Sequence, residues 1–361
     1  MPATNNNTYL NTAACGLISP SVLKAGTGLY DHFAQNSSGA AEHWRDVERL
    51  QIKENIAGFI GAPAADIALI PNFSFGMNAV VQALTGREKV LLYKKDFPSV
   101  YAPFVINKFD IVWLDDENGF TIDPDKIESI IREQHIDLVA ISHVQWQSGF
   151  RLNIKALCLL CRQHGVRTII DATQSLGAVD LQIPDTDPDV LISSNYKWMN
   201  AGFGNGILYM NPRFAAQYPA KITGMNSNTF HIAGNGFSFD GGVANYEPGS
   251  LNMFGFAVLN QAILEKKASG MPFIEQHNRA LTKMLLEELA SLPVSIIGPA
   301  AVEHRSSIVV LEDKNGLHAH LSQNNVITTG RNGLVRISIH LHNTEADIDT
   351  VVCCIKDWAK L

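Results

Sequence analysis

Short apolar runs rich in Val, Ile and Leu alternate with amphipathic stretches between residues 67 and 210. The apolar runs predict buried strands, and the amphipathic stretches predict helices that cover the strands. The predicted strands are Ile67–Pro71, Lys89–Tyr93, Ile111–Leu114, Leu138–His143, Arg167–Ala172, Val190–Ser193 and Gly206–Met210. The predicted helices are Phe75–Leu84, Tyr101–Lys108, Pro124–Glu133 and Ile154–His164. This alternation is typical of an α/β fold with a mostly parallel sheet.

The C-terminal part of the chain has a different pattern, with a long amphipathic helix followed by short strands and further helices. The predicted elements are the helices Met271–Leu292 and Leu317–Gln323, the strands Val294–Ile297, Ile308–Leu311 and Leu334–Ile339, and a last helix ending at Trp358. Asn343 or Thr344 is expected to cap the last helix, with Asp347 completing a capping box. We expect a smaller α+β unit, joined to the first part through the Gly- and Asn-rich stretch Asn226–Ser250.

Composition narrows the function classes. Hydrophobic residues make up 46% of the 361 residues and charged residues 17%, as in globular proteins. The net charge of −7 disfavours nucleic acid or an anionic membrane as a partner. The apolar runs are too short to span a bilayer, and the polar start of the chain does not resemble a secretory signal. The five cysteines, an odd number, indicate a reducing compartment, so we expect a cytoplasmic protein.

Two pairs of histidines could suggest a metal site. They are His318 with His320 and His340 with His342. Neither pair has cysteine or acidic neighbours at the spacing of metal ligands, so no metal is expected.

The most informative segment covers residues 171–206. Asp171 ends one predicted strand, and Lys197 follows the next predicted strand. Ligands of open α/β sheets bind beyond the carboxyl ends of the strands. A lysine there can form a Schiff base with pyridoxal phosphate (PLP), and an acid can keep the pyridine nitrogen protonated. From the spacing alone, an ion-paired acid and a surface lysine are an equally good interpretation.

The residues around this pair resemble a known family. The acid, an amide three residues later, a Ser-x-Tyr-Lys run and a glycine-rich turn are Asp171, Gln174, Ser194, Tyr196, Lys197 and Gly202–Gly204. This order is similar to that of the fold-type I PLP enzymes of aminotransferase class V, which include cysteine desulfurases, selenocysteine lyases, kynureninases and isopenicillin N epimerase-like proteins. The resemblance implies that Lys197 is the Schiff-base lysine and Asp171 the pyridinium partner. It also implies that Gln174 binds the ring hydroxyl.

The resemblance implies further contacts to the cofactor. The residues expected at its phosphate are Ser74, Phe75, Gly76, Ser194 and Tyr196, with Ser250 donated by the neighbouring subunit of a homodimer. The start of a helix at Ser74 suits a phosphate, because the free N–H groups and the helix dipole attract an anion. Phe97 is expected to stack on the ring, and Trp146 or Gln147 is expected to reach the cofactor or the substrate.

The resemblance also implies a substrate site and a fold. Arg336 lies in an R-x-S segment similar to the one that binds the substrate α-carboxylate in the family, and a guanidinium suits a carboxylate. Asn11, Ala13 and Cys15 are expected to contact the substrate. The implied fold is the PLP-dependent transferase fold type I, with a mostly parallel seven-stranded sheet and a smaller α+β C-terminal domain. We expect a large domain over residues 18–245, and a small domain from residues 1–17 and 246–361.

The reaction stays open at this point. Desulfurases carry a cysteine in the loop before the R-x-S segment, and here that loop, Thr328–Gly333, has no cysteine. We therefore expect a PLP enzyme that acts at Cα or Cβ of an amino acid by transamination, racemisation or elimination. The alternatives are a desulfurase or selenocysteine lyase, a kynureninase-like lyase, and a binding or regulatory protein with a PLP fold.

Overall fold

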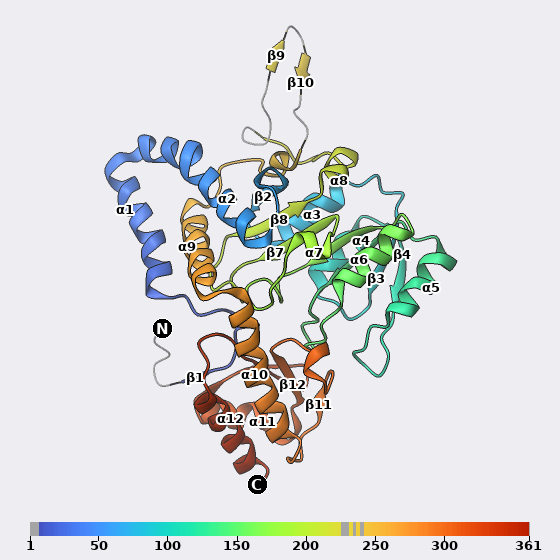
Figure 1. Ribbon diagram of the computed structural model, residues 1–361, viewed down its shortest axis with the longest axis vertical. Coiled ribbons are helices and arrows are strands. Elements are labelled where there is room, and N and C mark those ends of the chain that lie inside the picture. Colours follow the sequence, from blue (N-terminus) through green and yellow to red (C-terminus); the bar gives the residue numbers. More distant parts are fainter. Residues whose placement is uncertain (1–6, 225–230, 234–235, 239–241, 361) are drawn as a thin grey trace.

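The computed structural model describes residues 7–224, 231–233, 236–238 and 242–360. Its centre is a seven-stranded sheet in the order β2-β8-β7-β6-β5-β3-β4 (Figure 1). The strands are β2 Ile67–Ile70, β3 Lys89–Tyr93, β4 Asp110–Leu114, β5 Leu138–Ser142, β6 Arg167–Asp171, β7 Val190–Ser194 and β8 Gly206–Met210. Within this sheet only β8 is reversed, since it pairs antiparallel with both β2 and β7. The expected fold class, a mostly parallel seven-stranded sheet with helices, is confirmed.

Helices cover both faces of this sheet because successive strand residues point to opposite sides. In β2, Ile67 and Leu69 join one apolar core, while Ala68 and Ile70 join the other. The helices that contribute to the first core include α2 Arg49–Ile60, α5 Pro124–Gln134, α6 Ile154–Gln163 and α9 Met253–Ser269. The helices that contribute to the second core are α3 Phe73–Ala83, α4 Pro98–Ile106 and α8 Pro212–Gln217. A short helix, α7 Ile183–Thr186, precedes β7.

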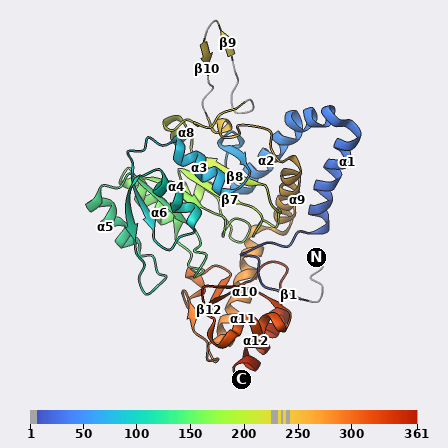
Figure 2. The ribbon, with the colours of Figure 1, turned by 180° about the vertical axis from the view of Figure 1, so that it is seen from behind.

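The C-terminal part forms a smaller unit around an antiparallel sheet in the order β11-β12-β15-β14. Its strands are β11 Ile296–Ile297, β12 Ile308–Glu312, β14 Thr329–Arg331 and β15 Leu334–Ser338, and its helices are α10 Met271–Leu289, α11 Leu317–Gln323 and α12 Glu345–Trp358. The start of the chain joins this unit, since β1 Thr8–Tyr9 pairs with β13 Val326–Ile327 (Figure 2). The predicted capping box of the last helix is confirmed: Thr344 and Asp347 form it.

Some elements were not expected from the sequence. They include the helix α1 Pro20–His43, which begins after the cap Ser19, the helices α2, α7, α8 and α9, and the strands β1, β13 and β14. The stretch Asn226–Ser250, expected to join the two parts, lies partly outside the described residues, which include 231–233, 236–238 and 242–250 of it. Its described parts include the strands β9 His231–Ala233 and β10 Gly236–Ser238, which pair as an antiparallel ladder.

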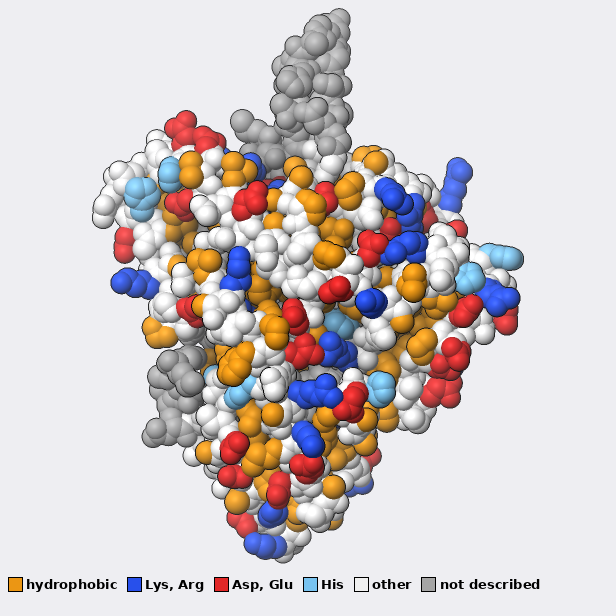
Figure 3. Space-filling view, viewed as in Figure 1, with side chains coloured by type: hydrophobic (Ala, Val, Ile, Leu, Met, Phe, Trp, Pro, Cys, Tyr) orange, Lys and Arg blue, Asp and Glu red, His pale blue; other side chains and the backbone are white. Residues whose placement is uncertain are grey.

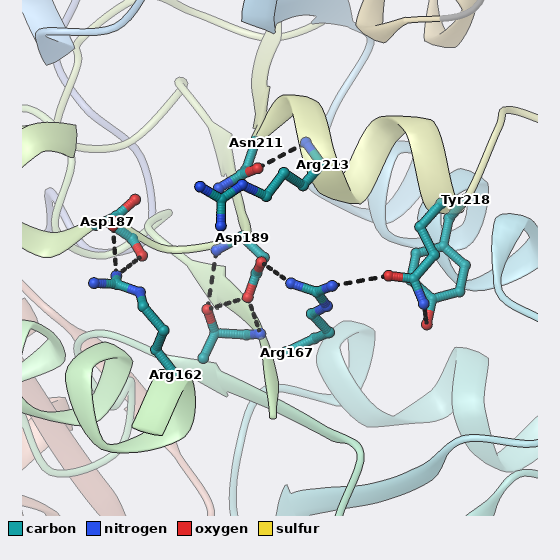
Figure 4. Close-up of polar contacts among 9 residues, drawn as sticks. Arg162, Arg167, Asp187, Asp189, Asn211, Arg213 and Tyr218 are labelled. Carbon is teal, nitrogen blue, oxygen red and sulfur yellow. Dashed lines mark hydrogen bonds and ion pairs between the residues drawn. The ribbon is translucent and has the colours of Figure 1, made fainter. Parts of the chain in front are cut away.

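Charged side chains link the amino ends of β6 and β7, at the edge of the sheet opposite their carboxyl ends (Figure 4). The carboxylate of Asp189 accepts a hydrogen bond from Thr168 N at 2.9 Å and pairs with Arg167 at 3.2 Å. Asp187 pairs with Arg162 at 2.6 Å. These contacts hold the register of the two strands whose other ends carry Asp171 and Ser194.

The surface gives two further observations. Among the described residues, no helix is both long and apolar enough to cross a membrane. On the face shown in Figure 3, acidic and basic side chains are interspersed, so the described residues form no large patch of one sign there.

Candidate active site

Two adjoining cavities lie beyond the carboxyl ends of the central strands. The strand-end cavity, of about 540 Å³, is lined mainly by residues that follow β2, β3, β6 and β7. The hairpin cavity, of about 280 Å³, is lined by the N-terminal segment and by β12, β14 and β15 of the small unit. The walls that both cavities share are Phe97, Trp146, Gln174, Tyr196 and Lys197. The two cavities therefore join beside Lys197, so its amine can contact a molecule bound in either one.

Lys197 is held in a buried turn after β7. Its side chain is only 7% exposed, and its Nζ lies 5.5 Å from the ring centroids of both Phe97 and Tyr196. Burial and the nearby Arg336 cation lower the pKa of Lys197 to about 8, against the opposing effect of Asp171. A large part of Lys197 is therefore neutral near pH 8, as a nucleophilic amine requires.

Asp171 lies at the end of β6 with its carboxylate in the strand-end cavity. Its Oδ1 accepts the Thr173 N–H at 2.8 Å, and its Oδ2 has a long contact of 3.4 Å from Ser142 Oγ. Burial raises the pKa of Asp171, and the hydrogen bonds from Thr173 together with the charge of Lys197 oppose this shift. Oδ2 is thus free to accept a stronger hydrogen bond from a cationic N–H group.

A second buried carboxylate stands behind Asp171 and was not anticipated. Asp96 accepts hydrogen bonds from Ser142 N at 2.8 Å, from Phe97 N at 2.7 Å and from Ser142 Oγ. Burial raises the pKa of Asp96 to about 6 despite these hydrogen bonds. Ser142 therefore lies between the two carboxylates with its hydroxyl donated to Asp96, and Asp96 positions both Ser142 and the backbone of Phe97.

The start of α3 faces the strand-end cavity through Asn72, Phe73 and Ser74. Ser74 Oγ lies 3.0 Å from Ser99 Oγ, and the hydroxyl of Ser194 accepts the Phe73 N–H at 2.8 Å. Since the Phe73 N–H is already donated within the protein, the features here that suit a phosphate are the positive dipole end of α3 and the hydroxyl of Ser74.

Phe75 and Gly76, two other residues expected at a phosphate, line neither cavity. The Phe75 N–H is donated to Asn72 Oδ1 at 2.9 Å, and the Gly76 N–H to Asn72 O at 3.1 Å. A Cβ at Gly76 would lie 2.5 Å from Ile70 Cδ1, so this glycine lets α3 pack against the sheet.

Aromatic side chains form the wall between the cavities. Phe97 and Trp146 meet edge to face, with ring centroids 5.6 Å apart. Tyr196 stacks on the exposed Phe203 of the glycine-rich turn at 4.6 Å. The indole N–H of Trp146 is buried and has no hydrogen-bond partner among the described residues, so it is available to a ligand. Gln147 lines the hairpin cavity.

Arg336 enters the hairpin cavity from β15. Its guanidinium donates to Trp146 O at 3.2 Å and approaches Thr329 Oγ1 at 3.5 Å. Its Nε is buried and has no partner among the described residues, so the group keeps donors for a ligand. Burial lowers the pKa of Arg336 to about 10, which still leaves it a cation near neutral pH.

Only some of the N-terminal residues expected at the substrate line a cavity. Ala13 lines the hairpin cavity, and its carbonyl accepts a hydrogen bond from Gln174 Nε2 at 3.2 Å. Asn11 accepts a hydrogen bond from Thr329 and Cys15 lies beside Tyr9, but neither lines the two cavities. Ser250 is exposed and lines neither cavity of its own chain.

Gln174 is bound on both sides, since its Oε1 also accepts the Trp198 indole N–H at 2.7 Å. These two bonds hold its amide against the wall that the two cavities share.

The residues of the strand-end cavity fit PLP. A carboxylate with a free acceptor oxygen lies in the same cavity as a lysine and the start of a helix, and Phe97 supplies an aromatic face. These groups match the ring nitrogen, the aldehyde, the phosphate and the ring face of the cofactor. Among the described residues, no group of three or more His, Cys, Asp or Glu side chains could hold a metal ion.

Comparison with known proteins identifies the family. The sequence profile of aminotransferase class V matches residues 8–351, so the chain belongs to that family of PLP-dependent enzymes. The enzyme class and the cofactor expected from the sequence are thereby confirmed.

Individual relatives are distant. The chain is 22% identical to a probable cysteine desulfurase of Methanothermobacter thermautotrophicus, over 96% of this chain and 94% of the relative. It is also 22% identical to a kynureninase of Pseudomonas fluorescens, over 78% of this chain and 69% of the relative. The structure of a cysteine desulfurase from Thermococcus onnurineus superposes with a TM-score of 0.90 at 21% identity, covering 99% of this chain and 95% of the other. This likeness confirms fold type I.

Proposed function

We propose that this chain catalyses a PLP-dependent reaction at Cα or Cβ of an amino acid, with Lys197 as the residue that carries the cofactor. The observation that carries the proposal is the buried amine of Lys197, whose pKa is lowered to about 8, at the junction of two cavities. One cavity fits the cofactor and the other holds a guanidinium for the substrate.

Each side chain has a role in this proposal. Bound PLP supplies an electron sink that stabilises negative charge at Cα. Asp171 would accept a hydrogen bond from the protonated ring nitrogen, and Phe97 would pack on the ring. The amine of Lys197 would move the proton at Cα of the substrate. Arg336 binds the α-carboxylate, with Gln147 and Ala13 beside it in the hairpin cavity.

Among the reaction branches, the persulfide route of a desulfurase has the least support. Segment 328–333 carries Arg331 and no cysteine. Burial raises the pKa of the Cys15 thiol, so it is not an activated thiolate. Cys158 and Cys161 lie three residues apart in α6, but burial raises the pKa of each thiol to about 12. Transamination, racemisation and β-elimination all begin with removal of the Cα proton, which Lys197 could perform, and none of them requires a catalytic cysteine.

A second candidate function is a lyase that cleaves a C–S or C–C bond. The desulfurase and kynureninase relatives favour it, as do the aromatic walls Phe97 and Tyr196 of the shared site. A binding or regulatory protein with this fold is less well supported, since both Lys197 and Asp171 are in place. A keto acid, alanine or sulfide as the product separates the branches.

The proposal includes a cytoplasmic homodimer with shared active sites. Ser250 is exposed on its own chain, which suits a residue that reaches the phosphate of a neighbouring subunit. The described cysteines are all free, as in a reducing compartment. The net charge of −7 argues against nucleic acid or an anionic membrane as a partner.

The experiment is a visible spectrum of the purified protein, with and without added PLP, followed by an amino-acid panel. We expect an absorption band of lysine-bound PLP that a substrate amino acid shifts or bleaches. Lys197→Ala should lose the band, whereas Lys155→Ala, which removes an exposed lysine on α6, should keep it. A band that survives in Lys197→Ala would overturn the assignment of Lys197, and no band with added PLP would overturn the proposed function.

A further inference from the structure

The antiparallel sheet of the small unit presents one row of side chains to the hairpin cavity. Thr329 pairs with Arg336, and Arg331 pairs with Leu334, across the ladder between β14 and β15. Because alternate residues share a face, all four side chains point to the same side, and all four line the cavity. Arg331 is therefore a second guanidinium in the wall that carries Arg336.

The turn of this hairpin holds Arg331 in place. The two turn residues, Asn332 and Gly333, have φ angles of 52° and 72°. Two successive positive φ angles define the tight two-residue hairpin turn that sets the register of its strands. The guanidinium carbon of Arg331 lies 5.2 Å from the ring centroid of Trp146. A cation–π contact with an indole holds a guanidinium near the ring and leaves its N–H groups available to a ligand.

Arg331 is not balanced by an acid. Among the described residues, it has no hydrogen-bond or ion-pair partner, and it acts as a like charge on Arg336. The arginines at the opposite edge of the sheet differ, because Asp187 pairs with Arg162 and Asp189 pairs with Arg167 (Figure 4). Arg331 is also exposed, so its cation is accessible to an anion that enters the cavity from solution.

The charges lining the hairpin cavity exceed what one α-carboxylate needs. Its lining residues include Lys197, Arg331 and Arg336 and no Asp or Glu. In the proposed function, Lys197 reacts and Arg336 binds the α-carboxylate, which leaves Arg331 unused. Arg331 and Arg336 are diagonal neighbours across the ladder, a relation that places side chains about 7–8 Å apart at their bases. Because both side chains line the same small cavity from neighbouring positions, their two guanidinium groups can bind the two carboxylates of one short molecule.

We infer that the substrate is a short-chain amino acid with a second carboxylate at the end of its side chain, and that Arg331 binds this distal carboxylate. The inference rests on the proposed function and names the substrate class of that same site. The cavity of about 280 Å³ suits a small substrate, since pockets for drug-sized ligands run from about 300 to 1,000 Å³. Trp146 pre-orients the guanidinium, so less side-chain freedom is lost on binding.

The test measures the affinity of the PLP-loaded protein for two acids that carry no amine and so cannot react. Glutarate has two carboxylates, and glutaramate has an amide in place of one of them. By calorimetry at fixed ionic strength, glutarate should bind about tenfold tighter or more, as expected for a charge-assisted hydrogen bond. Arg331→Gln should abolish this preference, Arg331→Lys should keep part of it, and Arg336→Gln should weaken both acids.

The matched control is Arg213→Gln, which removes an exposed arginine on α8 and should leave both affinities unchanged. Equal affinity of the unmodified protein for the two acids would overturn the inference. Equal weakening of both acids by Arg331→Gln would overturn it too, because Arg331 would then share the α-carboxylate with Arg336. Since binding of these acids requires no turnover, either result is distinct from failure of the proposed function, which the spectrum detects.

Discussion

At the scale of single residues, the pKa values of the site are shifted because its charged groups are buried and only partly neutralised by neighbouring charges. Lys197 is buried next to Arg336, which disfavours its cation, and next to Asp171, which favours it; the net effect is a lowered pKa. Asp171 and Asp96 are buried near each other, and burial raises the pKa of both carboxyl groups. Without the cofactor this arrangement is costly, and a positively charged ring nitrogen at Asp171 would relieve it.

The pKa of Lys197 predicts how capture of PLP depends on pH. The neutral amine attacks the aldehyde, so the capture rate should rise with pH until the pKa of about 8 and then level off. For a lysine with its usual pKa, the capture rate would keep rising until a pH of about 10.4. The measurement is the rate of borohydride-trapped labelling of the apo-protein across this range, corrected with Nα-acetyllysine for the titration of PLP itself.

Arg336→Gln is the informative variant for this profile, since it removes a cation that lowers the pKa of Lys197. Its midpoint should lie at a higher pH than that of the unmodified protein. A midpoint near the usual lysine value in the unmodified protein would contradict the role given to burial.

Sequence reasoning found the residues that occur in a linear pattern and missed those defined by distant contacts. Lys197 and Asp171 follow apolar strands, so their place at the carboxyl edge of the sheet was predictable. Asp96 was missed because its importance comes from Ser142, which lies on another strand. Arg331 was missed because only the pairing of β14 with β15 and the position of Trp146 bring it into the cavity.

At the scale of elements, the N-terminal segment braces the lysine turn. The Gly16 N–H donates to Tyr196 O at 2.8 Å, directly before Lys197. A Cβ at Gly16 would lie only 1.9 Å from Lys197 O, so no larger residue fits without movement of the backbone. The glycine thus allows the first segment of the chain to pack against the turn that positions the reactive amine.

Gly16→Ala should therefore destabilise the protein and weaken PLP binding. Overpacking of this kind costs about 1–3 kcal/mol, and here it displaces the backbone of Lys197 itself. Thermal unfolding and a PLP titration measure the two effects. Gly28→Ala is the matched control, since a Cβ at this exposed position of α1 meets no atom within 4 Å and alanine favours the helix. Unchanged PLP affinity in Gly16→Ala would refute the bracing role.

The elements themselves differ in how well the sequence predicts them. The ends of the central strands agree with prediction to within one or two residues, because a buried strand is a continuous apolar run bounded by polar residues. The helix α1 was missed because Gly26, Thr27 and Gly28 interrupt its apolar pattern. It is held by packing along α9, where Gly26 contacts Phe254 and Val258 so closely that a Cβ would clash.

At the scale of the whole molecule, a buried polar cluster joins the lysine turn to both units. His340 Nε2 lies 2.9 Å from Trp198 O and 3.0 Å from Lys266 Nζ, and Lys266 Nζ lies 3.0 Å from Asn200 Oδ1. Lys266 comes from α9, His340 follows β15, and Trp198 and Asn200 follow Lys197 directly. Movement of the small unit against the large one would therefore displace the turn that carries Lys197.

The proposed homodimer leads to a prediction about mixed subunits. If Ser250 acts on the neighbouring subunit, a heterodimer of a Lys197→Ala chain and a Ser250→Ala chain has one site with both residues intact and one site with neither. In this heterodimer, half of the sites should bind PLP with the affinity of the unmodified protein and attach it to Lys197. The other half, which lack both residues, should not attach it. Visible absorbance and PLP titration of differently tagged, co-purified chains measure this, and an unmodified chain paired with a Lys197→Ala chain is the control. If Ser250 instead acts within its own chain, every site of the mixed dimer lacks one residue, and no site keeps full affinity.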